Sequence, residues 1–130
     1  MDSGMGQKFA DGWSSGNPAQ FALLFTEDCL YEDIPLGVTA RGRTEIETHL
    51  RNWLASSSDI RMEFLDQVNE GDRVALEWSY TGTHDGPFEG LEPTGRSFEF
   101  RGASVFTVTG TKISACADYW DLAYLLKLLG

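Results

Sequence analysis

The hydrophobic repeat of this chain changes between residues 56 and 60, and the change limits the folds that the chain can adopt. Before it, apolar residues recur every three or four positions, as Met5, Phe9 and Trp13 do, which is typical of one face of a helix. After it, apolar residues alternate with polar ones, as in half-buried strands. A chain with helices in its first half and consecutive strands in its second half is expected to form an α+β fold.

The first half is expected to hold three helices and one short strand. Pro18 is typical of the first turn of a helix. Residues 44–47 have the pattern of a capping box, in which Thr44 caps the helix and Glu47 bonds back to it. The predicted segments are, in order, a helix over 5–14, a helix from Pro18 with Phe21, Leu24 and Phe25 on its apolar side, a strand over 29–34, and a helix from Thr44 that ends at 56–58.

The second half is expected to hold four strands joined by turns, followed by a short apolar helix. The predicted strands begin at Ile60 and cover residues 73–84, 97–109 and 112–121, with a turn at 69–72, a loop at 85–95 and the helix at 122–129. We therefore expect a single domain over residues 1–130. Its three N-terminal-half helices would pack on one face of a curved, mostly antiparallel sheet, forming a cone-shaped α+β barrel that can hold a pocket.

Composition excludes several classes of partner. Ten Lys and Arg against 20 Asp and Glu give a net charge of −10, which repels phosphate backbones and anionic lipids. We therefore expect neither nucleic acid nor a membrane as partner. The two cysteines and two histidines have no metal-ligand spacing, and no nucleotide-binding glycine loop is present, so we expect no metal and no cofactor. Without a signal-peptide or membrane-spanning pattern, a cytoplasmic location is expected.

Asp118 is the first candidate for chemistry. It lies in an otherwise apolar strand segment, where strand alternation puts it on one face with Ser114, Cys116 and Trp120. Apolar surroundings disfavour the charged form of a carboxyl, so the pKa of Asp118 would rise toward the range useful for acid/base catalysis. The alternative is that this face of the strand points to water.

Asp33 and the two histidines are the other candidates for proton transfer. Asp33 ends the first predicted strand and shares a face with Tyr31, although an aspartate here also suits a turn cap. His84 is either a proton shuttle or a structural hydrogen-bonding group. His49 lies on the third predicted helix, next to the apolar Leu50, and is expected at the surface.

Several segments of the chain resemble the SnoaL-like polyketide cyclase family. The loop GTHDGPFEGLEPTGR, residues 82–96, carries the family's Gly-Thr-His motif, which includes His84. Further matching segments are 31–33, 42–46, 110–113, 118–121 and 125–130. The resemblance covers nearly the whole chain and implies the cone of the nuclear-transport-factor-2-like superfamily. Because that fold hosts enzymes, carriers and adaptors, the reaction has to be argued from the site itself.

The resemblance also implies roles for individual residues. Asp118 matches the general acid/base that SnoaL-like cyclases use in an intramolecular aldol closure, and Asp33 matches the general base of ketosteroid isomerases. This chain lacks several residues that accompany the catalytic aspartates in the related enzymes. The cyclase histidine falls on Ser104, the epoxide-hydrolase arginine and second aspartate fall on Trp78 and Tyr80, and the isomerase tyrosine and protonated aspartate fall near Phe9 and Gly102. Neither hydrolase nor isomerase chemistry carries over whole.

We therefore expect an enzyme of secondary metabolism, an isomerase or lyase without cofactor. It would cyclise or isomerise a small apolar or aromatic, polyketide- or terpenoid-like substrate by proton transfer. The catalytic residues would be Asp118, Asp33 and His84, and the substrate-binding residues Tyr31, Trp53, Trp78, Tyr80, Phe100, Ser104, Phe106 and Trp120, with Trp13 also at the pocket. The alternatives are a binding or carrier protein, an epoxide-hydrolase-like enzyme with an incomplete triad, and an interaction protein. A homodimer through the outer face of the sheet, near Ala103, Val105 and Tyr119, is also expected.

Overall fold

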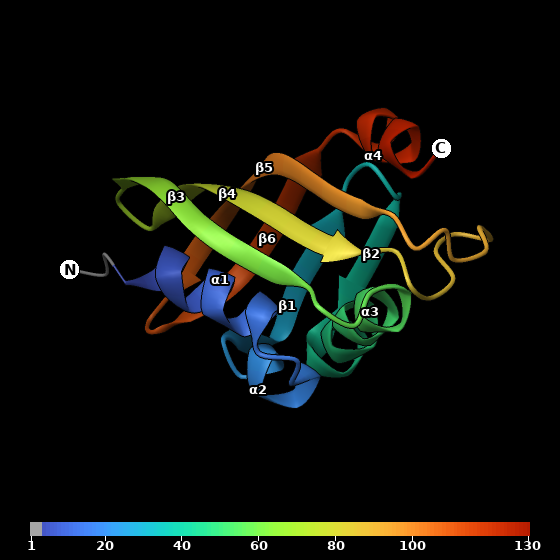
Figure 1. Ribbon diagram of the computed structural model, residues 1–130. Helices are drawn as coiled ribbons and strands as arrows, with labels where there is room; N and C mark the ends of the chain where they lie inside the picture. Colours follow the sequence, from blue (N-terminus) through green and yellow to red (C-terminus); the bar gives the residue numbers. More distant parts are fainter. Residues whose placement is uncertain (1–3) are drawn as a thin grey trace.

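The computed structural model describes residues 4–130, which form four helices and six strands (Figure 1). In chain order the elements are α1 (Met5–Ser14), α2 (Pro18–Ala22), β1 (Phe25–Asp33), β2 (Val38–Arg41), α3 (Gly42–Ser56), β3 (Arg61–Glu70), β4 (Arg73–Thr83), β5 (Ser97–Thr109), β6 (Lys112–Trp120) and α4 (Leu122–Leu129). The predicted bounds of α1, β5 and α4 are confirmed residue for residue.

The six strands form one sheet in the order β2-β1-β6-β5-β4-β3. Strands β1 and β6 are parallel, and the other neighbours are antiparallel. Helices α1, α2 and α3 lie together on one face of this sheet, and α4 lies beyond β5 (Figure 1). The α+β class and the mostly antiparallel sheet are therefore confirmed.

Aromatic side chains fill the space between the helices and the sheet. Phe9 of α1 contacts Phe21 of α2 and Phe106 of β5, with ring centroids 5.8 and 5.7 Å apart. These rings are buried, and burying one such ring contributes roughly 1.5–3 kcal/mol to folding. The core thus fixes the helical layer over the middle of the sheet.

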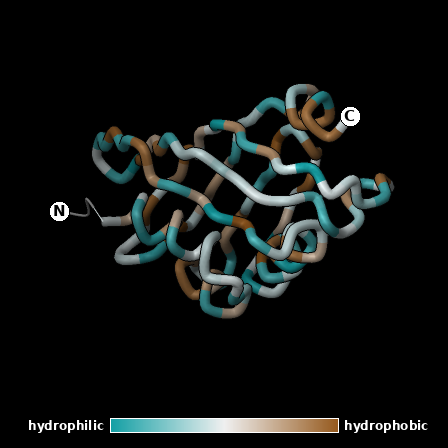
Figure 2. The backbone as a smooth tube through the Cα atoms, in the orientation of Figure 1, coloured by the Kyte–Doolittle hydropathy of each residue, from teal (hydrophilic) through white to brown (hydrophobic). Residues whose placement is uncertain are grey.

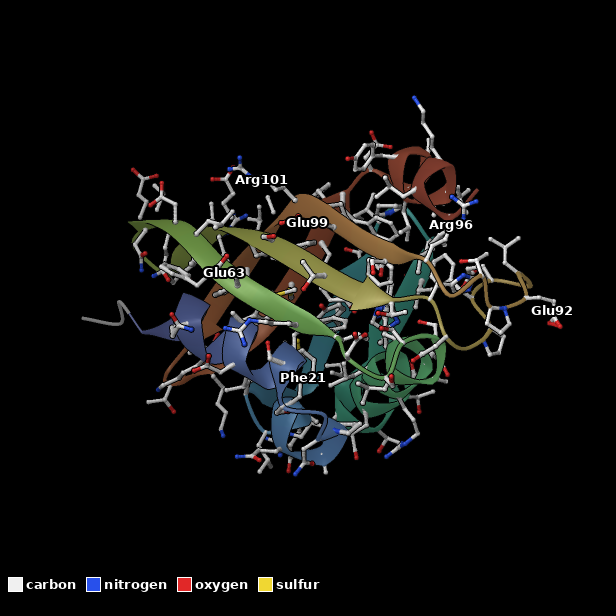
Figure 3. The ribbon with its side chains drawn as sticks, in the orientation of Figure 1. Phe21, Glu63, Glu92, Arg96, Glu99 and Arg101 are labelled. Atoms are coloured by element: carbon white, nitrogen blue, oxygen red, sulfur yellow. The ribbon has the colours of Figure 1, made fainter. Side chains whose placement is uncertain are left out.

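Charged side chains lie on the opposite side of the strands. In β5, Phe98 and Phe100 are buried whereas Glu99 and Arg101 are exposed. This alternation appears as repeated colour changes along the tube in Figure 2. Figure 3 shows Arg101 reaching outward from the sheet and Glu92 extending from the loop between β4 and β5.

The start of α3 differs from the prediction. The helix begins at Gly42, two residues before the predicted cap, and Arg41 is its N-cap residue. The backbone N–H of Arg41 donates to Glu45 Oε1 at 2.8 Å, so Glu45, not Glu47, bonds back to the helix start. The predicted capping box of Thr44 and Glu47 was therefore wrong.

The end of α2, the start of β1 and the presence of β2 also differ from the prediction. α2 ends at Ala22, and Phe25 opens β1, where it pairs with Ile113 of β6. Strand β2 was not predicted, because its four residues are too few to show alternation. It forms a hairpin with β1 through a turn in which Gly37 has φ +67°, a conformation that glycine adopts without strain.

Candidate active site

Two buried carboxyl groups lie side by side in the sheet. Asp33 ends β1, Asp118 lies near the end of β6, and the two residues are direct partners in the parallel pairing. Both are at most 4% exposed. Neighbouring strands are about 4.8 Å apart, so the register places two carboxyl groups in one small region of the molecule.

Asp118 accepts hydrogen bonds on both carboxyl oxygens. Ser104 Oγ donates to Oδ1 at 2.6 Å, and the Tyr31 hydroxyl donates to Oδ2. Trp78 Nε1 donates to Ser104 Oγ at 2.9 Å, and the Cys116 thiol lies 3.7 Å from Oδ1. Asp118 is thus held in one orientation by side chains from β1 and β5, the two strands beside it, and the alternative that it points to water is wrong.

The pKa of Asp118 is raised to about 6, chiefly because burial disfavours its charged form. The hydrogen bonds from Ser104 and Tyr31 act in the opposite direction. The nearby Asp33 raises the pKa and His49 lowers it. A carboxyl with this pKa exists in both protonation states near neutral pH, which suits a group that takes up and returns a proton.

Asp33 has two donors of its own. Trp120 Nε1 donates to Oδ1 at 3.0 Å, and His49 Nε2 donates to Oδ2 at 3.1 Å. His49 is only 6% exposed, so its predicted surface position was wrong. The signal was available in the sequence, because His49 lies three residues after Ile46 and four before Trp53, on the buried face of α3.

A cavity of about 20 Å³ lies where these two carboxyl groups meet the aromatic side chains. Its lining residues come from α1, α3 and all the strands except β2: Trp13, Asp33, Trp53, Met62, Trp78, Tyr80, Phe100, Asp118 and Trp120. A larger groove of about 270 Å³ lies outside it. That groove is lined by Leu36, Val38, His49, Asn52, Trp53, Ala55, Pro87, Phe88 and Glu89. Trp53 lines both, so the two spaces meet at its side chain.

The predicted substrate-binding residues divide into three groups. Five of them line the cavity: Trp53, Trp78, Tyr80, Phe100 and Trp120. Tyr31 and Ser104 instead bond to Asp118, and Phe106 packs against Phe9 in the core. Met62 lines the cavity although its strand position carried no chemical signal in the sequence.

His84 lies apart from the cavity. Its Nδ1 accepts from the backbone N–H of Thr94 at 3.2 Å and lies 3.0 Å from the Thr94 hydroxyl oxygen. Its backbone bonds to Gly95 and Arg96 across the same loop. These contacts join the two ends of the loop over residues 85–95. His84 therefore holds this loop in place.

Two polar atoms at the cavity residues have no hydrogen-bond partner among the residues that the structure describes. They are Trp13 Nε1 and the Tyr80 hydroxyl, both buried. The pKa of Tyr80 lies well above its usual value because of burial and the neighbouring Asp33 and Asp118, so its hydroxyl keeps its proton. An unpartnered buried donor costs about 1–3 kcal/mol, which makes both atoms candidates for binding a ligand.

Within residues 4–130, no three His, Cys, Asp or Glu side chains lie close enough together to hold a metal ion. No helix in this part of the chain is long and apolar enough to cross a membrane.

The sequence profile of the SnoaL-like polyketide cyclases matches residues 5–129. The chain belongs to this family. Among solved structures, a hypothetical protein of ketosteroid isomerase-like fold from Catenulispora acidiphila, in complex with trimethylamine, is 24% identical, with a TM-score of 0.89. The comparison covers 100% of this chain and 95% of that one. These matches confirm the nuclear-transport-factor-2-like or ketosteroid isomerase-like fold.

Two further relatives carry different functional names. IdmH of Streptomyces antibioticus, a candidate polyketide cyclase, is 24% identical with a TM-score of 0.85, over 98% of this chain and 97% of that one. A Cryptosporiopsis protein named monooxygenase dmxR10 is 24% identical over 119 residues, which are 90% of this chain and 77% of that protein. These names refer to different reactions. Family membership therefore does not identify the reaction, which has to be inferred from the site.

In this SnoaL-like chain, Ser104 takes the position at which the resemblance places the cyclase histidine. Its hydroxyl is a hydrogen-bond donor to Asp118 and has no titratable proton of its own near neutral pH. His49 and Asp33 supply an imidazole and a second carboxyl from other elements. The structure thus brings the side chains of Asp118, Asp33 and His49 together.

Proposed function

We propose that this chain is a cofactor-free acid/base enzyme that cyclises or isomerises a polyketide- or terpenoid-like substrate. The carrying observation is Asp118, a buried carboxyl with a pKa of about 6 at the wall of an aromatic-lined cavity. A group of this kind removes a proton from carbon beside a carbonyl and returns it elsewhere.

The surrounding side chains support this role. Ser104 and Tyr31 hold the Asp118 carboxyl, so that its orientation does not have to change when it takes up a proton. Asp33, held by His49 and Trp120, is the second acid/base group. The aromatic rings exclude water and pack against an apolar substrate. The groove outside Trp53 has room for the body of the substrate, whereas the cavity admits only its reacting end.

The Asp118→Asn variant tests this proposal. The assay follows uptake of deuterium from the solvent into the α-carbon of 1,3-dicarbonyl and poly-β-ketone probes by NMR, which detects proton removal even where ring closure does not follow. We expect the rate to fall roughly 10²–10⁴-fold in D118N. The matched control is Asp28→Asn, which changes an exposed aspartate of β1. An unchanged rate in D118N excludes the catalytic role.

We also propose a homodimer through the outer face of the sheet. Tyr119 of β6 is 50% exposed there, and Ala103 and Val105 of β5 are partly exposed. Sedimentation velocity over a wide concentration range tests this assembly. A monomer at the highest concentration contradicts it.

A further inference from the structure

The cavity holds two hydrogen-bond donors that the protein itself does not use. The indole N–H of Trp13 and the hydroxyl of Tyr80 have no partner among the described residues, and both side chains are at least 97% buried. Buried polar groups in folded proteins are nearly always paired, so donors left open in a cavity indicate an acceptor supplied from outside.

The two donors approach the same space from different layers of the fold. Trp13 belongs to α1 in the helical layer, and Tyr80 belongs to β4 in the sheet. Their rings meet edge to face, with centroids 5.6 Å apart and an interplanar angle of 86°. Both residues line the cavity that Asp33 and Asp118 also line.

The size of the cavity limits what it accepts. A volume of about 20 Å³ holds one water-sized group and excludes a ring. Trp53 lines both this cavity and the outer groove, and its ring lies 5.4 Å from Tyr80 and 5.2 Å from Phe88 of the loop, measured between centroids. An occupant of the cavity is therefore a single substituent of a larger molecule whose body lies in the groove.

The charges of the cavity select the chemical class of that substituent. A Trp N–H only donates, so its partner must be an acceptor. Two buried carboxyl groups repel an acceptor that already carries a full negative charge, such as a carboxylate or a phosphate. A neutral carbonyl oxygen accepts two hydrogen bonds and brings no charge.

We propose that Trp13 and Tyr80 form a subsite for the carbonyl oxygen of a neutral ketone. This assignment deepens the proposed function and rests on it for the identity of the cavity as the substrate site. The two donors would bind the oxygen while Asp118 faces the neighbouring carbon. When Asp118 removes a proton from that carbon, the electron pair of the C–H bond moves onto the carbonyl oxygen, and the same two donors stabilise the resulting enolate.

The test compares the binding of two probes of nearly equal shape, 1-indanone and indane. Isothermal titration of the wild-type chain is expected to give roughly tenfold tighter binding of the ketone, the effect of one neutral hydrogen bond in a buried site. In Tyr80→Phe and in Trp13→Phe this preference is expected to fall toward one, with the affinity for indane unchanged. The matched control is Tyr124→Phe, which removes a hydroxyl from an exposed tyrosine of α4.

Each outcome is decisive. A wild-type chain that binds both probes equally overturns the assignment, because the open donors then hold only water. A ketone preference that survives in Y80F and W13F overturns it as well, as does the absence of binding by either probe. Circular dichroism identifies a variant that fails to fold, and the other variant then decides. D118N separates this assignment from the proposed function: it is expected to keep the ketone preference even though its proton transfer is lost.

Discussion

His49 Nε2 lies 3.1 Å from Asp33 Oδ2 and so joins the buried face of α3 to the carboxyl at the end of β1. His49 also lines the outer groove, whereas Asp33 lines the inner cavity. The pair therefore links a residue of the groove to a residue of the cavity. A polar pair in this position fixes α3 relative to β1 at the edge of the candidate site.

We predict that His49 and Asp33 are energetically coupled. His49→Ala leaves one oxygen of a buried carboxyl without its donor, and Asp33→Asn replaces the carboxyl that His49 contacts. A double-mutant cycle by urea unfolding is expected to give a coupling of roughly 0.5–3 kcal/mol, the range for residues in direct contact. Strict additivity of the two substitutions contradicts a direct interaction.

We predict that Asp118→Asn stabilises the chain more at high pH than at low pH. The pKa of Asp118 is about 6 in the folded chain, against an ordinary value of 3.8. Between these values the folded chain keeps a proton that the unfolded chain has lost, so raising the pH weakens folding until Asp118 ionises in the folded state near pH 6. Above pH 7 the penalty is constant and amounts to at most roughly 3 kcal/mol.

Asparagine has nearly the shape of aspartate but does not titrate, so D118N lacks this penalty. Urea unfolding at pH 5, 6, 7 and 8 is expected to show a difference in unfolding free energy, variant minus wild type, that grows with pH and levels off above pH 7. A difference that stays constant, or that shrinks as the pH rises, contradicts the raised pKa.

We predict that removing a donor from Asp118 raises its pKa above about 6. Tyr31→Phe and Ser104→Ala each delete a hydrogen bond that stabilises the ionised form. Titration of the carboxyl carbon by NMR in ¹³C-Asp-labelled protein measures the change. Trp78→Phe is the graded control, because Trp78 donates to Ser104 and not to Asp118 itself, and it should move the pKa less. An unchanged pKa in both Y31F and S104A contradicts the roles given to these hydroxyls.

Much of the fold could be predicted because its elements carry strong periodic patterns. The strand alternation put Asp118 on the same face as Cys116 and Trp120, and the structure confirms this arrangement. Local pattern was less informative for Ser104 and Tyr31. Their contacts with Asp118 join residues 14 and 87 positions apart, and these contacts follow from the strand order, which no local pattern contains.

His49 is a residue whose burial the local pattern did indicate. Its helical position indicated burial, whereas histidine as a residue type is intermediate between buried and exposed. The partner that makes burial favourable, Asp33, comes from a strand 16 residues earlier in the chain. A buried polar residue is therefore predictable only when its partner is known.

Gly102 explains why the isomerase pattern is absent from this site. A Cβ atom added at Gly102 would lie 2.3 Å from the Trp78 ring, which also lines the cavity. An aspartate at this position, where the resemblance places the protonated aspartate of the isomerases, therefore has no room beside Trp78. We predict that Gly102→Ala displaces the Trp78 ring and weakens its hydrogen bond to Ser104.

The expected cost of Gly102→Ala is roughly 1–3 kcal/mol in unfolding free energy, as for other overpacked sites. The control is Gly4→Ala, where an added Cβ meets no atom within 4 Å. Thermal unfolding measures the cost, and the NMR signal of the Trp78 indole N–H reports the loss of its hydrogen bond. Combining G102A with Trp78→Leu frees space beside residue 102, so the alanine should cost less in that background than in the wild-type chain. An equal cost in the two backgrounds contradicts steric exclusion by Trp78.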